Sequence, residues 1–285
     1  MQFAECLLQT FVLAVAAESF ILGLKRRYKL HAVIIPVIVV VCLLMLNMFQ
    51  QRERLWEKQK DLFLSAFESN PQSEIISNTL GVILLREKSN DSALFFLDKA
   101  TIIKPDYAQA YYNKGIAYEK KQQIQMAIYQ YKRAIDLKST YQESHFRLSQ
   151  IYYNKANYDS AELIINQVIR MKVANAEALD LYGKILYQKG NVRKSIKYYE
   201  AALKLDDDNA QYLYNLAVSV GYLGDYQRAF SLLKTSITIN PNFSEGYYLL
   251  GIVEFKLGKD GCPNLIKARL LGNQMAGLAI QEFCK

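Results

Sequence analysis

The side chains that most often carry out acid–base or metal chemistry are scarce in this sequence. Its 285 residues include two histidines, His31 and His145, and four cysteines, which form no CxxC pair for zinc or redox chemistry. No P-loop, HExxH motif, nucleophile elbow or glycine-rich dinucleotide turn occurs. The sequence therefore indicates no catalytic residue, no metal site and no cofactor, and we expect a protein that is not an enzyme.

Two of the cysteines, Cys262 and Cys284, could form a disulfide. They lie at the start of one predicted helix and near the end of the next, 22 residues apart, and two antiparallel helices would bring these ends together. An exported location would allow oxidation, and the bond would then stabilise the C-terminal end by about 3 kcal/mol. Two free thiols are the alternative.

The net charge of +8 does not indicate nucleic-acid binding. Four of the basic residues, Lys25, Arg26, Arg27 and Lys29, lie together between two apolar stretches. The remaining basic excess is mild and spread over many predicted helices, which is typical of a solvated surface. We therefore expect no nucleic-acid partner.

The N-terminal end has the composition of a membrane region. Residues 30–49 contain no charged side chain, and a helix of this length spans about 30 Å, the thickness of a bilayer's hydrocarbon core. Residues 6–24 are predicted to form a second span, or a re-entrant segment packed on the first, although Gln9 and Glu18 interrupt the apolar run. A cleaved signal peptide is the alternative for 6–24, but the basic start of such peptides is missing.

The basic cluster between the two predicted spans sets the expected orientation. Positive loops favour the cytoplasmic side, so both flanking ends would face outward. We therefore predict an integral protein of a bacterial inner membrane, with its C-terminal domain in the periplasm. If residues 6–24 do not span, this orientation could reverse.

Beyond the membrane region a pattern recurs every 34 residues from Glu74, without insertion or deletion. Small residues hold the eighth, twentieth and twenty-seventh positions, and larger residues hold the eleventh and twenty-fourth. The eighth position is occupied by Gly81, Gly115, Ser149, Gly183, Ala217 and Gly251. At helical spacing, such small residues let two antiparallel helices approach closely.

This pattern resembles the tetratricopeptide repeat over residues 74–243, and continues to about 257. The resemblance implies an all-α fold in which pairs of helices stack into a right-handed superhelix, an α-solenoid. We expect three regions: a membrane region at 1–49, a connecting helix or half repeat at 50–73, and a solenoid of five to six repeats at 74–285. Because neither Pro nor Gly occurs between Pro36 and Pro71, the membrane helix should run into the connecting helix.

The last repeat departs from the pattern. Its twentieth position is Pro263, which suits the start of a helix, and Gly272 then predicts a break. The residues that follow, NQMAGLAIQEFCK, predict a capping helix that shields the last apolar face.

In the family that the repeats resemble, first-helix positions 2, 5, 6, 9, 12 and 13 line a concave groove. Aromatic rings there give contact area at low entropy cost, and Asn side chains can hydrogen-bond a peptide backbone. The resemblance therefore implies a protein or peptide partner, although simple packing is the alternative for any single residue. The candidates are Tyr112, Asn113, Phe146, Arg147, Tyr153, Lys184, Tyr187, Tyr214, Asn215, Tyr222, Tyr248 and Phe255.

Two functions follow from these patterns. The first is a membrane-anchored scaffold that holds a partner through the groove. The second comes from the junction after the apolar span, which resembles that of multi-pass O-mannosyltransferase-like proteins with C-terminal tetratricopeptide repeats. That resemblance implies the non-catalytic end of a glycosyltransferase that positions protein substrates, and no site residue carries over. The matching residues are Arg52, Trp56, Leu62, Phe63, Asn70, Pro71, Leu80 and Gly81.

Overall fold

The computed structural model describes residues 31–171 and 175–284, and every regular element in these ranges is an α-helix. The all-α prediction is thus confirmed for the described residues. The chain divides into two units that meet in sequence at Ser65 and Ala66. The helices are α2 (His31–Ser69), α3 (Glu74–Arg86), α4 (Asn90–Ile103), α5 (Ala108–Lys120), α6 (Ile124–Leu137), α7 (Gln142–Asn154), α8 (Tyr158–Arg170), α9 (Ala176–Gln188), α10 (Val192–Leu205), α11 (Ala210–Tyr222), α12 (Tyr226–Ile239), α13 (Ser244–Lys256), α14 (Cys262–Leu270) and α15 (Gln274–Phe283).

The first unit contains most of α2, a single helix of 39 residues. As the lack of Gly and Pro predicts, the helix continues without a break from the apolar segment into the connecting segment. Among the residues that the structure describes, no helix offers a stretch both long and apolar enough to cross a membrane. The span at 30–49 is therefore not confirmed, and the one at 6–24 lies outside the described residues.

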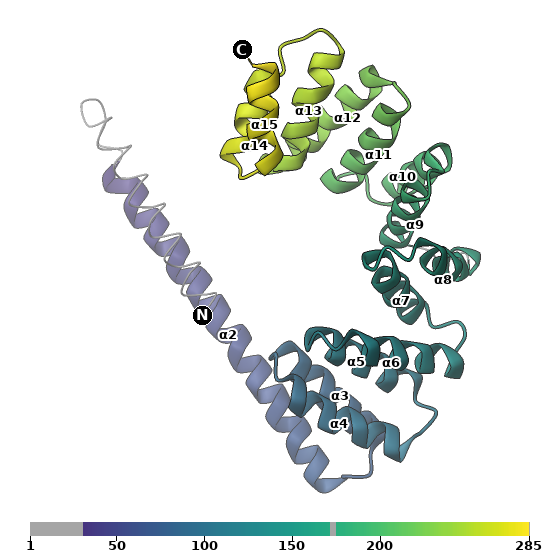
Figure 1. Cartoon of the computed structure of the whole chain (residues 1–285). Coiled ribbons are helices and arrows are strands. Elements are labelled where there is room, and N and C mark those ends of the chain that lie inside the picture. Colours follow the sequence, from purple (N-terminus) through teal and green to yellow (C-terminus); the bar gives the residue numbers. More distant parts are fainter. Residues whose placement is uncertain (1–30, 172–174, 285) are drawn as a thin grey trace. The chain divides into compact units, whose positions relative to one another are not determined.

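The second unit is built from helix pairs that follow one another in chain order (Figure 1). Each odd-numbered helix from α3 to α13 packs against the next helix of the chain, and each pair packs against the following pair. The first helices of the pairs begin 34 residues apart, which confirms the register of the sequence repeat. Their starting residues are Glu74, Ala108, Gln142, Ala176, Ala210 and Ser244.

Within a pair, the helices touch where the first one carries a small residue at its eighth position. A methyl group added to Gly115 would lie 2.4 Å from Cε1 of Tyr131, and one added to Gly183 would lie 2.6 Å from Cε1 of Tyr199. Tyr131 is fully buried. These glycines therefore leave the space that the large side chain of the second helix fills.

The turn inside each repeat also recurs, and here the sequence is less informative. The residue after the first helix's C-cap has a positive φ in all six repeats, which is the left-handed region. Three of these residues are the glycines 190, 224 and 258, but the other three are Lys88, Gln122 and Ala156. The turn therefore keeps the same left-handed backbone conformation in all six repeats, although Lys, Gln and Ala rarely adopt a positive φ.

Ion pairs join successive repeats at equivalent positions. Lys121 pairs with Asp91, and Lys189 Nζ lies 2.6 Å from both Asp159 Oδ1 and Glu162 Oε2. Because the carboxylates of Asp91 and Asp159 are largely exposed, these contacts contribute little to stability. The helix contacts of the core, rather than these ion pairs, hold the repeats together.

The C-terminal end follows the prediction in part. Pro263 lies in the first turn of α14, Gly272 has a φ of +91° before α15, and a disulfide joins Cys262 to Cys284. However, α15 does not close the solenoid with a polar surface: Leu278 is 62% exposed. Its buried residues are the small Ala276 and Ala279, and α15 packs against α14 with Phe283 stacked on Phe255 of α13, in the place expected for a capping helix.

We expect Gly115→Ala to destabilise the protein by about 1–3 kcal/mol, because the new methyl group would overlap the buried ring of Tyr131. Urea unfolding of the full chain, followed by circular dichroism, measures this change. Gly277→Ala in α15 is the matched control, since nothing lies within 4 Å of the added methyl group, and we expect it to be neutral or stabilising. Equal midpoints for the two variants would contradict the proposed role of Gly115.

Candidate binding groove

The described residues offer no arrangement for metal chemistry. In the ranges 31–171 and 175–284, no group of three His, Cys, Asp or Glu side chains converges to hold an ion. His145 is buried, and its Nδ1 lies 2.9 Å from the carbonyl oxygen of Tyr141, one helical turn earlier. This histidine is therefore a packed residue with a local hydrogen bond.

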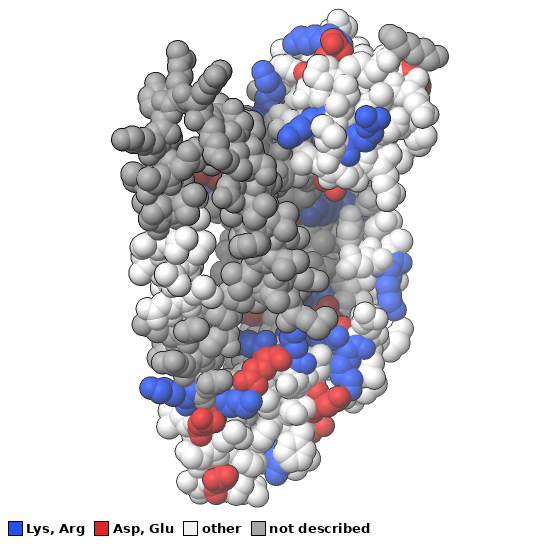
Figure 2. Space-filling view, turned by 90° about the vertical axis from the view of Figure 1, so that its left-hand side faces the viewer, with Lys and Arg blue, Asp and Glu red and all other residues white. Residues whose placement is uncertain are grey.

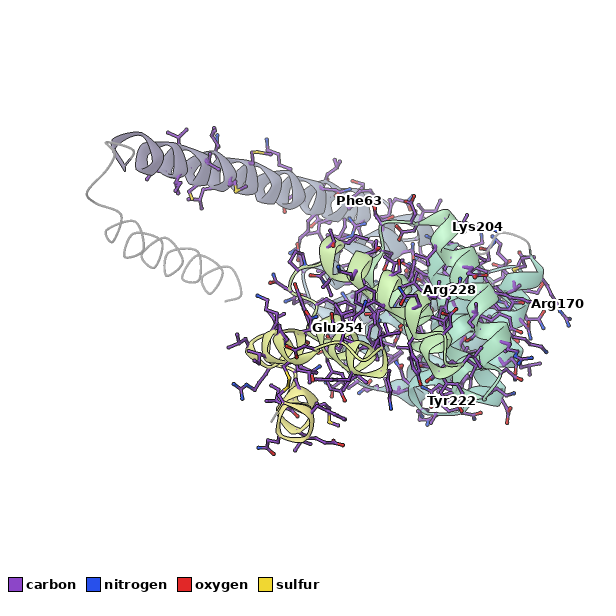
Figure 3. The ribbon with its side chains drawn as sticks, turned by 90° about the horizontal axis from the view of Figure 1, so that it is seen from above. Phe63, Arg170, Lys204, Tyr222, Arg228 and Glu254 are labelled. Carbon is purple, nitrogen blue, oxygen red and sulfur yellow. A yellow bond between two sulfur atoms is a disulfide. The ribbon has the colours of Figure 1, made fainter. Side chains whose placement is uncertain are left out.

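The predicted groove residues differ in how accessible they are. Asn113 and Asn215 are buried, with 5% and 8% of their surfaces exposed, and Tyr222 is 70% exposed. Figure 3 shows Tyr222 at the edge of the described ribbon. The remaining candidates are half-buried: Tyr112, Phe146, Arg147, Tyr153, Lys184, Tyr187, Tyr214, Tyr248 and Phe255.

Three of the candidates meet in one cavity. A half-open cavity of about 210 Å³ lies among the first helices α5, α7 and α9, and Tyr112, Phe146 and Arg147 line it. It is completed by Gln142, Glu143, Val168, Asn175, Glu177 and Ala178. The sequence analysis did not name Glu143 and Glu177 as candidates, although they occupy position 2 of their helices, one of the groove positions.

Arg147 is the cation of this cavity. Burial on its own would lower the pKa of Arg147, but the hydrogen bond to Tyr112 and the negative charge of Glu119 outweigh burial and raise it. Glu119 in turn accepts a hydrogen bond from the hydroxyl of Tyr131. The guanidinium is thus held in its charged form next to two aromatic side chains.

The two asparagines tie neighbouring first helices together. Asn113 Nδ2 donates to Asn78 Oδ1 over 2.8 Å, joining α5 to α3. Asn215 Nδ2 donates to Asp180 Oδ1 over 2.6 Å, joining α11 to α9. Both asparagines are therefore engaged inside the protein, and the structure gives no support to the expectation that they bond a peptide backbone.

Asp180 is the centre of a small polar network. Besides accepting from Asn215, its Oδ2 lies 2.6 Å from the ammonium nitrogen of Lys184. Burial, followed by the charge of Asp180, raises the pKa of the neighbouring Tyr212 to about 12. Lys184, another predicted groove residue, therefore forms an ion pair with a carboxylate of its own helix.

Several of the predicted aromatic residues contact other rings. The ring of Tyr187 lies 6.0 Å from that of Tyr222, and Tyr112 makes an edge contact with Tyr141 at 5.3 Å. Phe255 stacks on Phe283 of α15, with ring centres 5.2 Å apart. Such contacts fix the orientation of the rings without covering all of their surface.

Charges of both signs are present on the described surface of one face of the molecule (Figure 2). Figure 2 shows Lys and Arg side chains interspersed with Asp and Glu over the described residues of the visible face. This distribution agrees with the mild net charge of +8.

Comparison with known families identifies the repeating unit. A model described as tetratricopeptide repeat matches residues 108–141, 142–172 and 210–243, and a second, described as TPR repeat, matches residues 183–221. These segments are tetratricopeptide repeats. Their boundaries at 108, 142 and 210 coincide with the starts of α5, α7 and α11.

Solved structures share the fold of these repeats. A chain of the APC/C hetero-tetramer Cut9–Hcn1 is 15% identical, with a TM-score of 0.63 over 79% of this chain; the match spans 46% of that protein's length. Pseudomonas aeruginosa pilF is 15% identical, with a TM-score of 0.60 over 73% of this chain and 90% of its own. A tetratricopeptide repeat protein from Parabacteroides merdae is 16% identical, with a TM-score of 0.57 over 77% of this chain and 88% of its own.

No curated protein sequence matches this chain significantly. None of the matches supports the resemblance to multi-pass O-mannosyltransferase-like proteins, which concerned roughly residues 1–90. What these comparisons establish is the repeat and its fold.

We expect Asn215→Ala to destabilise the protein by about 1–3 kcal/mol, because the change removes a buried partner of the Asp180 carboxylate. The midpoint of urea unfolding measures the effect. Tyr222→Ala, on the same helix but at an exposed position, should shift the free energy of unfolding by less than about 0.5 kcal/mol. A neutral Asn215→Ala would show that the interhelical hydrogen bond carries no stability.

Proposed function

We propose that this protein is a scaffold whose tetratricopeptide repeats bind an extended segment of a partner protein along their first helices. The observation that carries the proposal is the half-open cavity among α5, α7 and α9, where three of the predicted groove residues converge. Repeats of this kind occur in proteins that bind other proteins or peptides, which gives the proposal its class of partner.

The chemistry of the cavity suits a peptide. Its two rings, Tyr112 and Phe146, are half-buried and offer apolar surface that is already ordered. Arg147 and the carboxylates of Glu143 and Glu177 add charged groups beside these rings. A binding site with aromatic anchors and a polar rim is typical of protein interfaces.

We expect Phe146→Ala to weaken the binding of a peptide selected on the full chain from a display library. The loss should be about tenfold or more in Kd, because a buried aromatic anchor contributes over 1 kcal/mol, and fluorescence anisotropy measures it. Tyr129→Ala, which removes an exposed ring of α6 outside the cavity, is the matched control and should leave Kd unchanged. If both variants bound like the parent, the cavity would not be the binding site.

We also propose that the chain is anchored in a membrane through residues 30–49, with the repeats on the exported side. The absence of any charge in this stretch supports the anchor. So do the exposed aliphatic side chains on every side of α2 between positions 38 and 48, including Leu43, Leu44 and Met48. The disulfide Cys262–Cys284 supports the exported side, because such bonds persist in oxidising compartments.

Labelling of introduced cysteines tests the anchor and its orientation. In a Cys6→Ser, Cys42→Ser background, Asp207→Cys in the loop between α10 and α11 should react with an impermeant maleimide in intact cells, and Arg27→Cys should react only after lysis. The protein should also sediment with membranes that have been washed with carbonate. The reverse labelling pattern would overturn the orientation, and release by carbonate would overturn the anchor.

A further inference from the structure

The cavity among α5, α7 and α9 holds three charged side chains that differ in position and sign. Glu143 and Glu177 occupy the same second position of α7 and α9, and both are exposed. Arg147 lies one turn after Glu143 on α7 and is half-buried. The two carboxylates therefore belong to the rim of the cavity, and the guanidinium to its inner part.

These three charges make no ion pair with one another. Glu143 and Arg147 are separated by four residues of one helix, the spacing at which opposite charges commonly pair. The ion pairs within 4.0 Å among the described residues include Lys184–Asp180 and Lys114–Asp98, but none involves Glu143, Arg147 or Glu177. Arg147 has its hydrogen bond to Tyr112 and the nearby charge of Glu119, whereas the exposed Glu143 and Glu177 are left to solvent or to a ligand.

Helix formation does not by itself require the carboxylates of Glu143 and Glu177. An acidic residue in the first turn does favour a helix, and both glutamates lie in that turn. Yet the second position is Gln109 in α5 and Gln211 in α11, two helices that are equally regular. The repeat accepts a neutral side chain here, and also a glutamate away from the cavity, Glu245 in α13, so helix formation does not dictate the charge at this position.

On these grounds we propose that the cavity selects a peptide segment carrying a basic and an acidic side chain close together, with Glu143 and Glu177 binding the basic group and Arg147 the acidic group. The inference rests on the proposed function and names the chemistry of its partner. A ligand of one sign would bring a like charge close either to Arg147 or to the two glutamates, which is unfavourable. A segment with both signs satisfies all three side chains.

The size of the cavity limits the occupant to side chains. About 210 Å³ lies below the range of about 300–1,000 Å³ that small-molecule ligands occupy. Neighbouring helices pack about 8–10 Å apart, and an extended peptide advances about 3.3 Å per residue. Basic and acidic residues two or three positions apart would therefore reach α7 and α9 together.

Selection from a random-peptide display library on the full chain in detergent tests the inference. The parent protein should enrich peptides in which Lys or Arg lies two or three residues from Asp or Glu. The variant with Glu143→Gln and Glu177→Gln should lose the basic preference, and its Kd for a parent-selected peptide should rise about tenfold. Arg147→Gln should lose the acidic preference, and Arg147→Lys, which keeps the charge, should restore it.

Glu245→Gln is the matched control, since Glu245 holds the same position in α13, is exposed and lies outside the cavity. This variant should select the same peptides as the parent. Enrichment of peptides with no charge pattern, or a pattern unaffected by the glutamate changes, would overturn this inference and leave the proposed function standing. A parent protein that enriches no peptide would overturn both.

Discussion

The close approach of two helices at a single small residue is the constraint on which the repeats depend. Where Gly115 and Gly183 lie, a methyl group would overlap the rings of Tyr131 and Tyr199. The same contact recurs between Gly81 and Leu97, so one geometry is used with either a ring or an aliphatic side chain. Because this spacing sets how far apart the helices of a pair lie, it also sets where the next pair can pack. Other interactions, including the ion pairs between repeats, contribute less, because these helix contacts already set the spacing of the stack.

Much of the fold could be predicted because packing imposes a period. Small residues must recur at fixed intervals, and the first helices accordingly begin at 34-residue steps from Glu74. The turns were less predictable, because Lys88 and Ala156 adopt the left-handed conformation for which glycine is the usual sequence signal. The candidate site was predicted only in part. Position within the repeat located Tyr112, Phe146 and Arg147, but it could not distinguish a side chain that faces a ligand from one that faces the next helix, as Asn113 and Asn215 do.

The candidate groove positions therefore carry two kinds of polar residue. In one kind, hydrogen bonds are completed inside the protein, as with Asp180, which has both Asn215 and Lys184 as partners. In the other kind, exemplified by Glu143 and Glu177, the charge stays at the rim of a cavity. The first kind fixes neighbouring helices, and the second leaves its charge exposed to solvent. Both kinds occupy positions 2, 5, 6 and 9 of the first helices. A side chain that finds a partner in the adjacent repeat, as Asp180 does, is of the first kind.

The buried hydrogen bond between Asp180 and Asn215 has a consequence for how the chain can evolve or be rearranged. The donor to Asp180 is supplied by the sixth position of the following repeat, and in most repeats a different residue stands there: Leu181 in α9 and Leu249 in α13. If the repeat of α11 were exchanged for a copy of either, a carboxylate would face an aliphatic side chain in the interior. The repeats are consequently not interchangeable modules. A copy of the α5 repeat would keep an amide donor, because Asn113 holds the same sixth position, so only exchange with a unit that lacks this asparagine would be selected against at this joint.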